Sequence, residues 1–301
     1  MEAACLGIFM ISAGVFTALL EYPNSAVHQA IASSDLRRAL IGIAMGLTAM
    51  GLINSPWGRQ SGAHMNPAVT LAFLRLGNVP KWDATFYIGA QFVGGLLGVL
   101  ITKAALGITF TDPAVNYVIT VPGDAGVVAA FVGEAFIACC LMLMILIVTN
   151  IPKLARWTGI LVGMLIAMAI TLEAPYSGMS INPARTVASA FPSGVWTAVW
   201  IYFIAPIGGM WVAVELFRAL RKGIQVACPK LNHHPSRRCI FCGFAGNQQG
   251  NVRGTAAKFI SVVLRTPRAS QPVESSKIQP STEPDESCHS KGSDADEERY
   301  L

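Results

Sequence analysis

Charged residues are scarce in this chain. Only 13% of its 301 residues are charged and 53% are hydrophobic, whereas an ordinary soluble domain is about 25% charged. The scarcity is uneven: residues 1–220 contain 10 Lys/Arg and 9 Asp/Glu, and the final 81 residues contain 12 and 8. This distribution predicts one integral membrane domain over 1–220 and a polar tail. The net charge of +5 is then explained by the excess of basic residues that is expected in cytoplasmic loops. It does not require a nucleic-acid partner, and none is expected.

The first apolar stretch lacks the basic leader of a secretory signal peptide. It begins almost at Met1 and contains Glu2, so we interpret it as a membrane span that is kept in the mature protein. Either the segment before this span is very short, or the sequence begins after the natural N-terminus.

Six apolar stretches have roughly the 17–25 residues that a membrane-spanning helix needs. They cover about 3–20, 37–54, 83–106, 127–149, 157–173 and 195–217. No nucleophile–base pair and no set of metal ligands converges within them, so an enzyme is the least favoured class and no cofactor is expected. The pattern predicts an all-α membrane protein with six transmembrane helices.

The chain divides into two copies of one order of elements: two spans, a short re-entrant half-helix and a third span. The copies cover about 1–106 and 127–220. Because each copy has an odd number of spans, the two lie in opposite orientations, an inverted repeat of the kind known from transporters. Arg37 and Arg38 lie on the outer side, but a larger number of basic residues lies in the connections on the opposite side. By the positive-inside rule, this excess predicts that both termini are cytoplasmic, in a plasma (cell inner) membrane. The basic residues of these connections are Arg75, Lys81, Lys153, Arg156, Arg218, Arg221 and Lys222.

Each copy contains the tripeptide Asn-Pro-Ala, as Asn66-Pro67-Ala68 and Asn182-Pro183-Ala184. The Asn side chain can cap a helix, and Pro is suited to its first turn. The predicted helices, over about 66–77 and 182–191, are each roughly 15 Å long, half of a hydrocarbon core of about 30 Å. Irregular backbone at membrane depth is tolerated only where it is buried or lines water, so two half-helices that meet near the midplane predict a pore.

With their neighbours, at 62–70 and 178–185, these motifs resemble the two signatures of the aquaporin, or major intrinsic protein, family. The resemblance covers residues 1 to about 220 and implies an aquaporin-like right-handed bundle, a passive channel and a homotetramer with one pore per protomer. Asn66 and Asn182 would then direct amide N–H groups at a passing water. The positive ends of the half-helices, about half a charge each, would disfavour hydronium and metal cations.

Arg185 directly follows the second motif. By resemblance it is the arginine of the aromatic/arginine constriction, and a buried intramembrane Arg is by default a functional residue. Local alignment places Met45, Ile170 and Met179 at the other positions of this selectivity filter. A strict water channel typically has an aromatic residue, a His and a small residue at these three positions. The Met, Ile and Met found here lack the His donor and make the rim of the filter more apolar, which argues against strict water selectivity.

Other positions favour water. Thr186 and Ala190 stand where glycerol-type channels carry Asp and a basic residue, and Tyr202 and Phe203 are both aromatic. We therefore predict a water channel that also admits small neutral solutes. The alternatives are a facilitator of glycerol, ammonia or hydrogen peroxide, a coupled transporter, and a structural or regulatory membrane protein that acts through its tail.

A glutamate begins a span in each copy, at Glu2 and Glu134. A carboxylate at membrane depth needs donors, and the loops before the half-helices have backbone N–H groups that need acceptors. The resemblance implies that each Glu supports the loop of its own copy. His64 lies beside the first motif and is predicted to pack against or line the cytoplasmic half of the pore, with a pH-dependent gate as the alternative.

The tail has two parts. Residues 221–265 are basic and membrane-proximal, and within 15 of them lie three Cys and two His: Cys228, His233, His234, Cys239 and Cys242. This set is compatible with tetrahedral zinc; unconnected thiols and acylation sites are the alternatives, and the basic run would also suit anionic lipid. Residues 266–301, rich in Pro, Ser and acidic residues, are predicted to be disordered.

Overall fold

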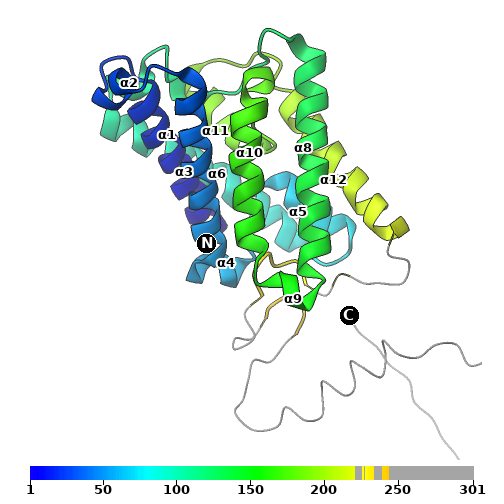
Figure 1. Ribbon diagram of the computed structural model, residues 1–301. Coiled ribbons are helices and arrows are strands. Elements are labelled where there is room, and N and C mark those ends of the chain that lie inside the picture. The colour runs from blue at the N-terminus through cyan, green and yellow to red at the C-terminus, as the bar shows by residue number, and fades with distance from the viewer. Residues whose placement is uncertain (221–225, 227, 234–238, 244–301) are drawn as a thin grey trace, which may run out of the picture. The chain divides into compact units, whose positions relative to one another are not determined.

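The computed structural model describes residues 1–220, 226, 228–233 and 239–243 (Figure 1). Its described part is all-helical and confirms the predicted fold class. Within these residues, six helices are long and apolar enough to cross a membrane. They are α1 (Glu2–Glu21), α3 (Ser34–Asn54), α6 (Lys81–Leu106), α8 (Gly126–Thr149), α10 (Thr158–Ser177) and α12 (Ile201–Leu220).

Two shorter helices begin at the Asn-Pro-Ala motifs: α5 (Pro67–Arg75) and α11 (Pro183–Ser193). In each, the Asn before the helix accepts a backbone N–H with its side chain, and Pro occupies the first turn, as predicted. α11 continues to Ser193 past Pro192, two residues beyond the predicted end. Because Pro192 lies in the last turn, its ring disturbs little of the helix.

Three pairs of spanning helices form the closest contacts: α1 with α6, α8 with α12, and α3 with α10. The first two pairs correspond to each other in the inverted repeat. Figure 1 shows α3 and α10 side by side. A Cβ at Gly98 would overlap the carbonyl oxygen of Gly7, and one at Gly46 would overlap that of Gly163. Glycine therefore sets how closely these helices approach, as is common between spans.

The connections contain short helices: α2 (Ala26–Ala30), α4 (Pro56–Ser61), α7 (Ile108–Thr111), η1 (Asn116–Val118) and α9 (Pro152–Ala155). α4 and α9 lie at the end of the bundle where α1 begins and α12 ends (Figure 1). Large apolar side chains are exposed around the outside of the spans, among them Phe86 at 72% and Val128 at 76%. Such a surface is suited to lipid.

Two boundaries differ from the sequence prediction. α10 continues to Ser177, past the predicted end at about 173, so Glu173 lies inside this helix and is buried. α12 begins at Ile201 and not near 195, because the chain turns before it, with Ala198 in the left-handed region at φ 49°. Neither change alters the number of spans.

Candidate pore

A cavity of about 530 Å³ runs between the two repeats. Both motif asparagines line it, and so do His64 and all four residues predicted for the selectivity filter: Met45, Ile170, Met179 and Arg185. Met45 comes from α3, Ile170 from α10, Met179 from the loop before α11 and Arg185 from α11 itself. Residues that the sequence separates by up to 140 positions are thus brought to the wall of one cavity.

The loops before the half-helices repeat each other in backbone conformation, 116 residues apart. Gly62 and Gly178 have positive φ, and so do the non-glycine pairs Ala63 and Met179, and Met65 and Ile181, at 47° to 55°. A positive φ is strained for residues with a side chain and persists only where the surroundings impose it. The surroundings that impose it here are two buried glutamates and the two motif asparagines.

Glu2 supports the first loop. Its Oε1 accepts from the Ser61 hydroxyl at 2.6 Å and from the His64 amide at 3.2 Å, and its Oε2 accepts from the Met65 amide at 2.6 Å. Gln91 of α6 donates to the same carboxylate at 2.9 Å. The side chain is 3% exposed, so these donors replace its hydration.

Glu134 makes the corresponding contacts with the second loop. Its Oε1 accepts from the Ser177 hydroxyl at 2.8 Å and the Ser180 amide at 2.7 Å, and its Oε2 accepts from the Ile181 amide at 2.6 Å. It is fully buried. The donors lie at positions 116 residues beyond those of Glu2, so one supporting device occurs twice.

Two tyrosines complete this device, and the sequence analysis missed their role. The Tyr87 hydroxyl of α6 donates to the Ser61 carbonyl at 2.7 Å, and the Tyr202 hydroxyl of α12 donates to the Ser177 carbonyl at 2.6 Å. Both stand in the third span of their repeat, 115 residues apart. That spacing, so close to the spacing of the motifs, is the signal by which they could have been found.

The two motif asparagines tie the loops to each other. Asn66 Nδ2 donates to the carbonyl oxygen of Ile181 at 2.7 Å, and Asn182 Nδ2 donates to that of Met65 at 2.8 Å. Their Oδ1 atoms accept from the first turns of the half-helices. Because an amide NH₂ has two hydrogens, one N–H of each asparagine is left for a molecule in the cavity.

Arg185 lines the cavity and is 8% exposed. Its Nη1 is buried and has no hydrogen-bond partner among the described residues. The side chains of Met45 and Met179, at 2% and 7% exposed, and of Ile170 cannot accept a strong hydrogen bond. The wall therefore combines three apolar side chains with one cationic donor.

The two arginines that seemed to break the charge pattern are engaged within the protein. Arg37 is buried and pairs with Glu21 at 3.0 Å. Arg38 pairs with Asp35 at 2.7 Å and donates to the carbonyl of Thr171 at 2.9 Å. A charge neutralised in this way counts little as a topological signal.

His64 lies in the cavity wall at the end of the bundle that carries α4. It is 3% exposed and stacks on Phe73, with ring centroids 5.1 Å apart. Its Nδ1 is 3.1 Å from the Thr70 hydroxyl, and its Nε2 is 2.8 Å from the carbonyl oxygen of Pro229. Since a carbonyl only accepts, Nε2 carries a proton. His64 thus lines the cavity and also contacts the backbone of Pro229 in the tail.

Part of the tail packs against this same end. Leu231 is 4% exposed and lines the cavity, although the sequence prediction ended the channel domain at residue 220. Cys228, His233, Cys239 and Cys242 lie close together, whereas His234 lies outside the described residues, as do 266–301. Burial raises the pKa of the Cys228 thiol above its ordinary value.

Comparisons with known proteins agree with this architecture. The family model described as "Major intrinsic protein" matches residues 3–217. "Aquaporin NIP6-1" of Arabidopsis thaliana is 32% identical over 219 residues, 72% of this chain and 70% of that protein. "Aquaporin NIP2-3" of Zea mays is 32% identical and is matched over 69% of each chain. "Putative aquaporin NIP4-1" of Arabidopsis thaliana is 36% identical, but the match spans 58% of its length and 56% of this chain.

Among solved structures, the aquaglyceroporin from Plasmodium falciparum superposes with a TM-score of 0.62 and covers 72% of this chain and 92% of its own. At 22% identity that likeness shows the fold alone. Six spans around a cavity bounded by two half-helices define a membrane channel and not an enzyme. The chain belongs to the major intrinsic protein family.

Proposed function

We propose that this protein is a passive membrane channel that conducts water and small neutral solutes and excludes protons and ions. The observation that carries the proposal is the composition of the cavity wall: Asn66, Asn182 and Arg185 supply donors to the same cavity whose other filter positions are apolar. The names of the relatives, which include aquaporins and an aquaglyceroporin, point to the same class.

Ion exclusion rests on fixed positive potential. The N-termini of α5 and α11 meet at the motif asparagines, which donate to each other's loops, and each helix end adds about half a positive charge there. Arg185 adds a full charge, and no acidic side chain of the described chain is hydrogen-bonded to its Nη1. A cation in the cavity would be repelled both by the two helix ends and by the charge of Arg185. A water between the two amide donors orients its own hydrogens away from them, which interrupts a chain of proton transfers.

Solute selection rests on Met45, Ile170 and Met179. Two flexible thioethers and a branched aliphatic chain give an apolar rim that tolerates methyl and methylene groups. Arg185 then supplies the hydrogen bond that replaces part of the solute's hydration. This rim favours a second candidate function, a facilitator of glycerol, ammonia or hydrogen peroxide in which water is a minor permeant.

Orientation, membrane and assembly are also part of the proposal. Lys81, Lys153 and Arg218 lie at or beside the end of the bundle where α1 begins, so the positive-inside rule places that end in the cytoplasm. We assign the protein to a plasma, or cell inner, membrane, and by family resemblance we propose a homotetramer with one pore per protomer. Cross-linking in mild detergent that stops at monomer or dimer would contradict the tetramer.

Stopped-flow measurements on proteoliposomes test the proposal. The purified chain should raise water permeability above that of protein-free vesicles, with measurable glycerol or ammonia flux and no proton current. Asn182→Asp is the matched variant, because it keeps the size of the side chain and changes its donor and its charge. Water flux at the level of protein-free vesicles would contradict the channel, whereas fast glycerol flux with slow water flux would favour the second candidate.

A further inference from the structure

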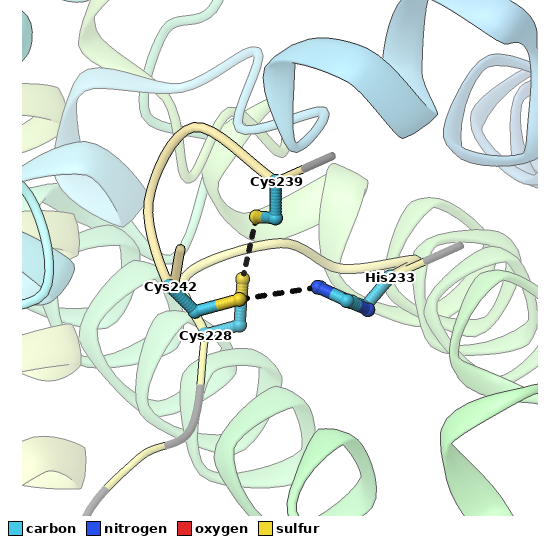
Figure 2. Close-up of side chains that lie close together, drawn as sticks. All are labelled: Cys228, His233, Cys239 and Cys242. Atoms are coloured by element: carbon cyan, nitrogen blue, oxygen red, sulfur yellow. Dashed lines mark hydrogen bonds between the residues drawn. The ribbon is translucent and has the colours of Figure 1, made fainter. Parts of the chain in front are cut away.

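We infer that Cys228, His233, Cys239 and Cys242 form a zinc site that holds the tail segment against the mouth of the pore. The ligand atoms of these four side chains all lie within 4.8 Å of one another. Figure 2 shows them converging from two segments, 228–233 and 239–242, with the thiols and the imidazole directed at a common centre. Three sulfurs and one nitrogen make a Cys₃His set, which is a frequent structural zinc site.

The separations match a shared cation better than a disulfide. Cys228 Sγ and Cys239 Sγ are 3.5 Å apart, and His233 Nε2 is 3.3 Å from Cys242 Sγ. A disulfide needs about 2.05 Å. Ligands at about 2.3 Å and 2.1 Å from a tetrahedral zinc would be separated by roughly 3.6 to 3.8 Å. The atoms reach this arrangement with small side-chain shifts.

The proposed ligands can be reached from solvent, and their donor atoms suit zinc. Cys239 is buried while Cys242 is exposed, so a cation can enter from solvent. Soft sulfur ligands with one imidazole in tetrahedral order select zinc over magnesium or calcium.

The segment that carries the site is bound to the channel along its length. Leu231 donates its amide to the Gly62 carbonyl at 3.1 Å, Pro229 accepts from His64, and the Lys230 ammonium donates to the Arg59 carbonyl at 3.2 Å. The Asn232 amide group donates to Asn54 at 2.7 Å. On the second segment, the Phe241 ring meets the Tyr87 ring edge-on with centroids 6.1 Å apart. The partners belong to α3, α4, α6 and the first motif loop.

This docking places an apolar side chain in the pore wall. Leu231 lines the same cavity as His64 and Asn66, and the metal would hold it there because Cys228 and His233 flank it on both sides. Without the metal, the short segment keeps only its individually weak hydrogen bonds and the packing of Leu231. We therefore expect zinc occupancy to keep Leu231 in the cavity wall and zinc loss to free it and widen the pore mouth. This consequence rests on the proposed channel function, whereas the metal site does not.

Metal binding is tested on the full-length protein in detergent under reducing conditions. We expect about one Zn²⁺ per protomer, and Co²⁺ in its place should give the visible absorption of a tetrahedral thiolate site. Cys239→Ser and Cys242→Ser should each lower metal affinity by about tenfold or more. Cys140→Ser, in α8, is the matched control and should retain the metal. A reduced parent protein that binds neither ion would overturn the site.

The coupling to the pore is tested by stopped-flow water permeability of proteoliposomes. Chelation should raise the permeability about twofold, and added Zn²⁺ should reverse it, because the constriction at Leu231 is released and restored. Leu231→Ala should bind zinc like the parent and show the higher permeability without chelation. If the zinc-loaded parent, the chelated parent and Leu231→Ala have the same water permeability, and it exceeds that of protein-free vesicles, the coupling is overturned. If the protein binds zinc but the water permeability of every form equals that of protein-free vesicles, the proposed channel function is contradicted instead.

Discussion

Asn66 and Asn182 each hold the other's loop. The Asn66 amide donates to the carbonyl of Ile181, which directly precedes Asn182, and the Asn182 amide donates to that of Met65, which directly precedes Asn66. The two half-helices are therefore fixed end to end by a reciprocal pair of hydrogen bonds. A substitution that removes the amide N–H of either asparagine therefore removes one of the two hydrogen bonds that join the half-helices.

Replacing Asn66 or Asn182 with Asp should weaken cation exclusion. The substitution keeps the shape of the side chain, removes the N–H donor and places a carboxylate between the positive helix ends. We expect a measurable cation or proton current in proteoliposomes and a smaller change in water flux. Asn78→Asp, outside the cavity lining, is the control and should conduct no protons. If both motif variants remain as tight to protons as the parent, the assigned mechanism is wrong.

Arg185→Val should admit protons, cations and larger neutral solutes. The change removes the fixed positive charge and an Nη1 donor that has no partner in the described part of the chain, and it shortens the side chain at the constriction. Proton flux, followed with a dye inside the vesicles, and glycerol flux should both rise. Arg185→Lys keeps the charge and should exclude cations better than the Val variant. Unchanged selectivity in Arg185→Val would show that this side chain does not control the constriction.

Glu2→Gln and Glu134→Gln should destabilise the protein to a similar extent. Each carboxylate accepts buried hydrogen bonds from backbone amides and a serine. The side-chain amide of Gln has only one oxygen, so at least one of these donors loses its acceptor, which costs about 1–3 kcal/mol of stability. Thermal unfolding in detergent should begin at a lower temperature in both variants. The exposed pair Glu215–Arg75 offers the control, because Glu215→Gln should change stability by less than about 1 kcal/mol. A stable Glu134→Gln protein would contradict its supporting role.

Ile170→His should sharpen selectivity for water. The imidazole would add a donor and an acceptor to an apolar part of the cavity wall and narrow the opening, which raises the cost for solutes with methylene groups. We expect glycerol or ammonia flux to fall more than water flux. Ile170→Leu is the size-matched apolar control and should leave the ratio near that of the parent. An equal fall for all solutes would indicate that position 170 does not select.

Truncation after Gly243 should leave both the pore and the zinc site intact. The described helices, the residues that line the cavity and all four proposed ligands precede this position. Water permeability per protein and metal content should match those of the full chain. Truncation after Leu220 is the contrasting variant: it removes Leu231 and the ligands and should show the higher permeability expected of the metal-free protein. Loss of flux at equal abundance after the shorter truncation would reveal a role for 244–301.

Much of this architecture could be predicted from local pattern. Long apolar stretches identify the spans because lipid imposes composition over some 20 consecutive residues. The Asn-Pro-Ala pairs identify the half-helices because capping and the first turn depend on neighbouring residues. The repeat spacing and the two glutamates then indicated which loops meet and what supports them.

The number of spans, the half-helices and the motif tripeptides could thus be predicted, since each depends on residues close in the chain. The folded chain was needed to reveal that Tyr87 and Tyr202 hold the motif loops, that Glu173 is buried in α10 and that Leu231 reaches the cavity. It also brought three cysteines and His233 within ligand distance. These are contacts between distant segments, whose geometry follows from helix packing and from loop conformations that no local pattern specifies.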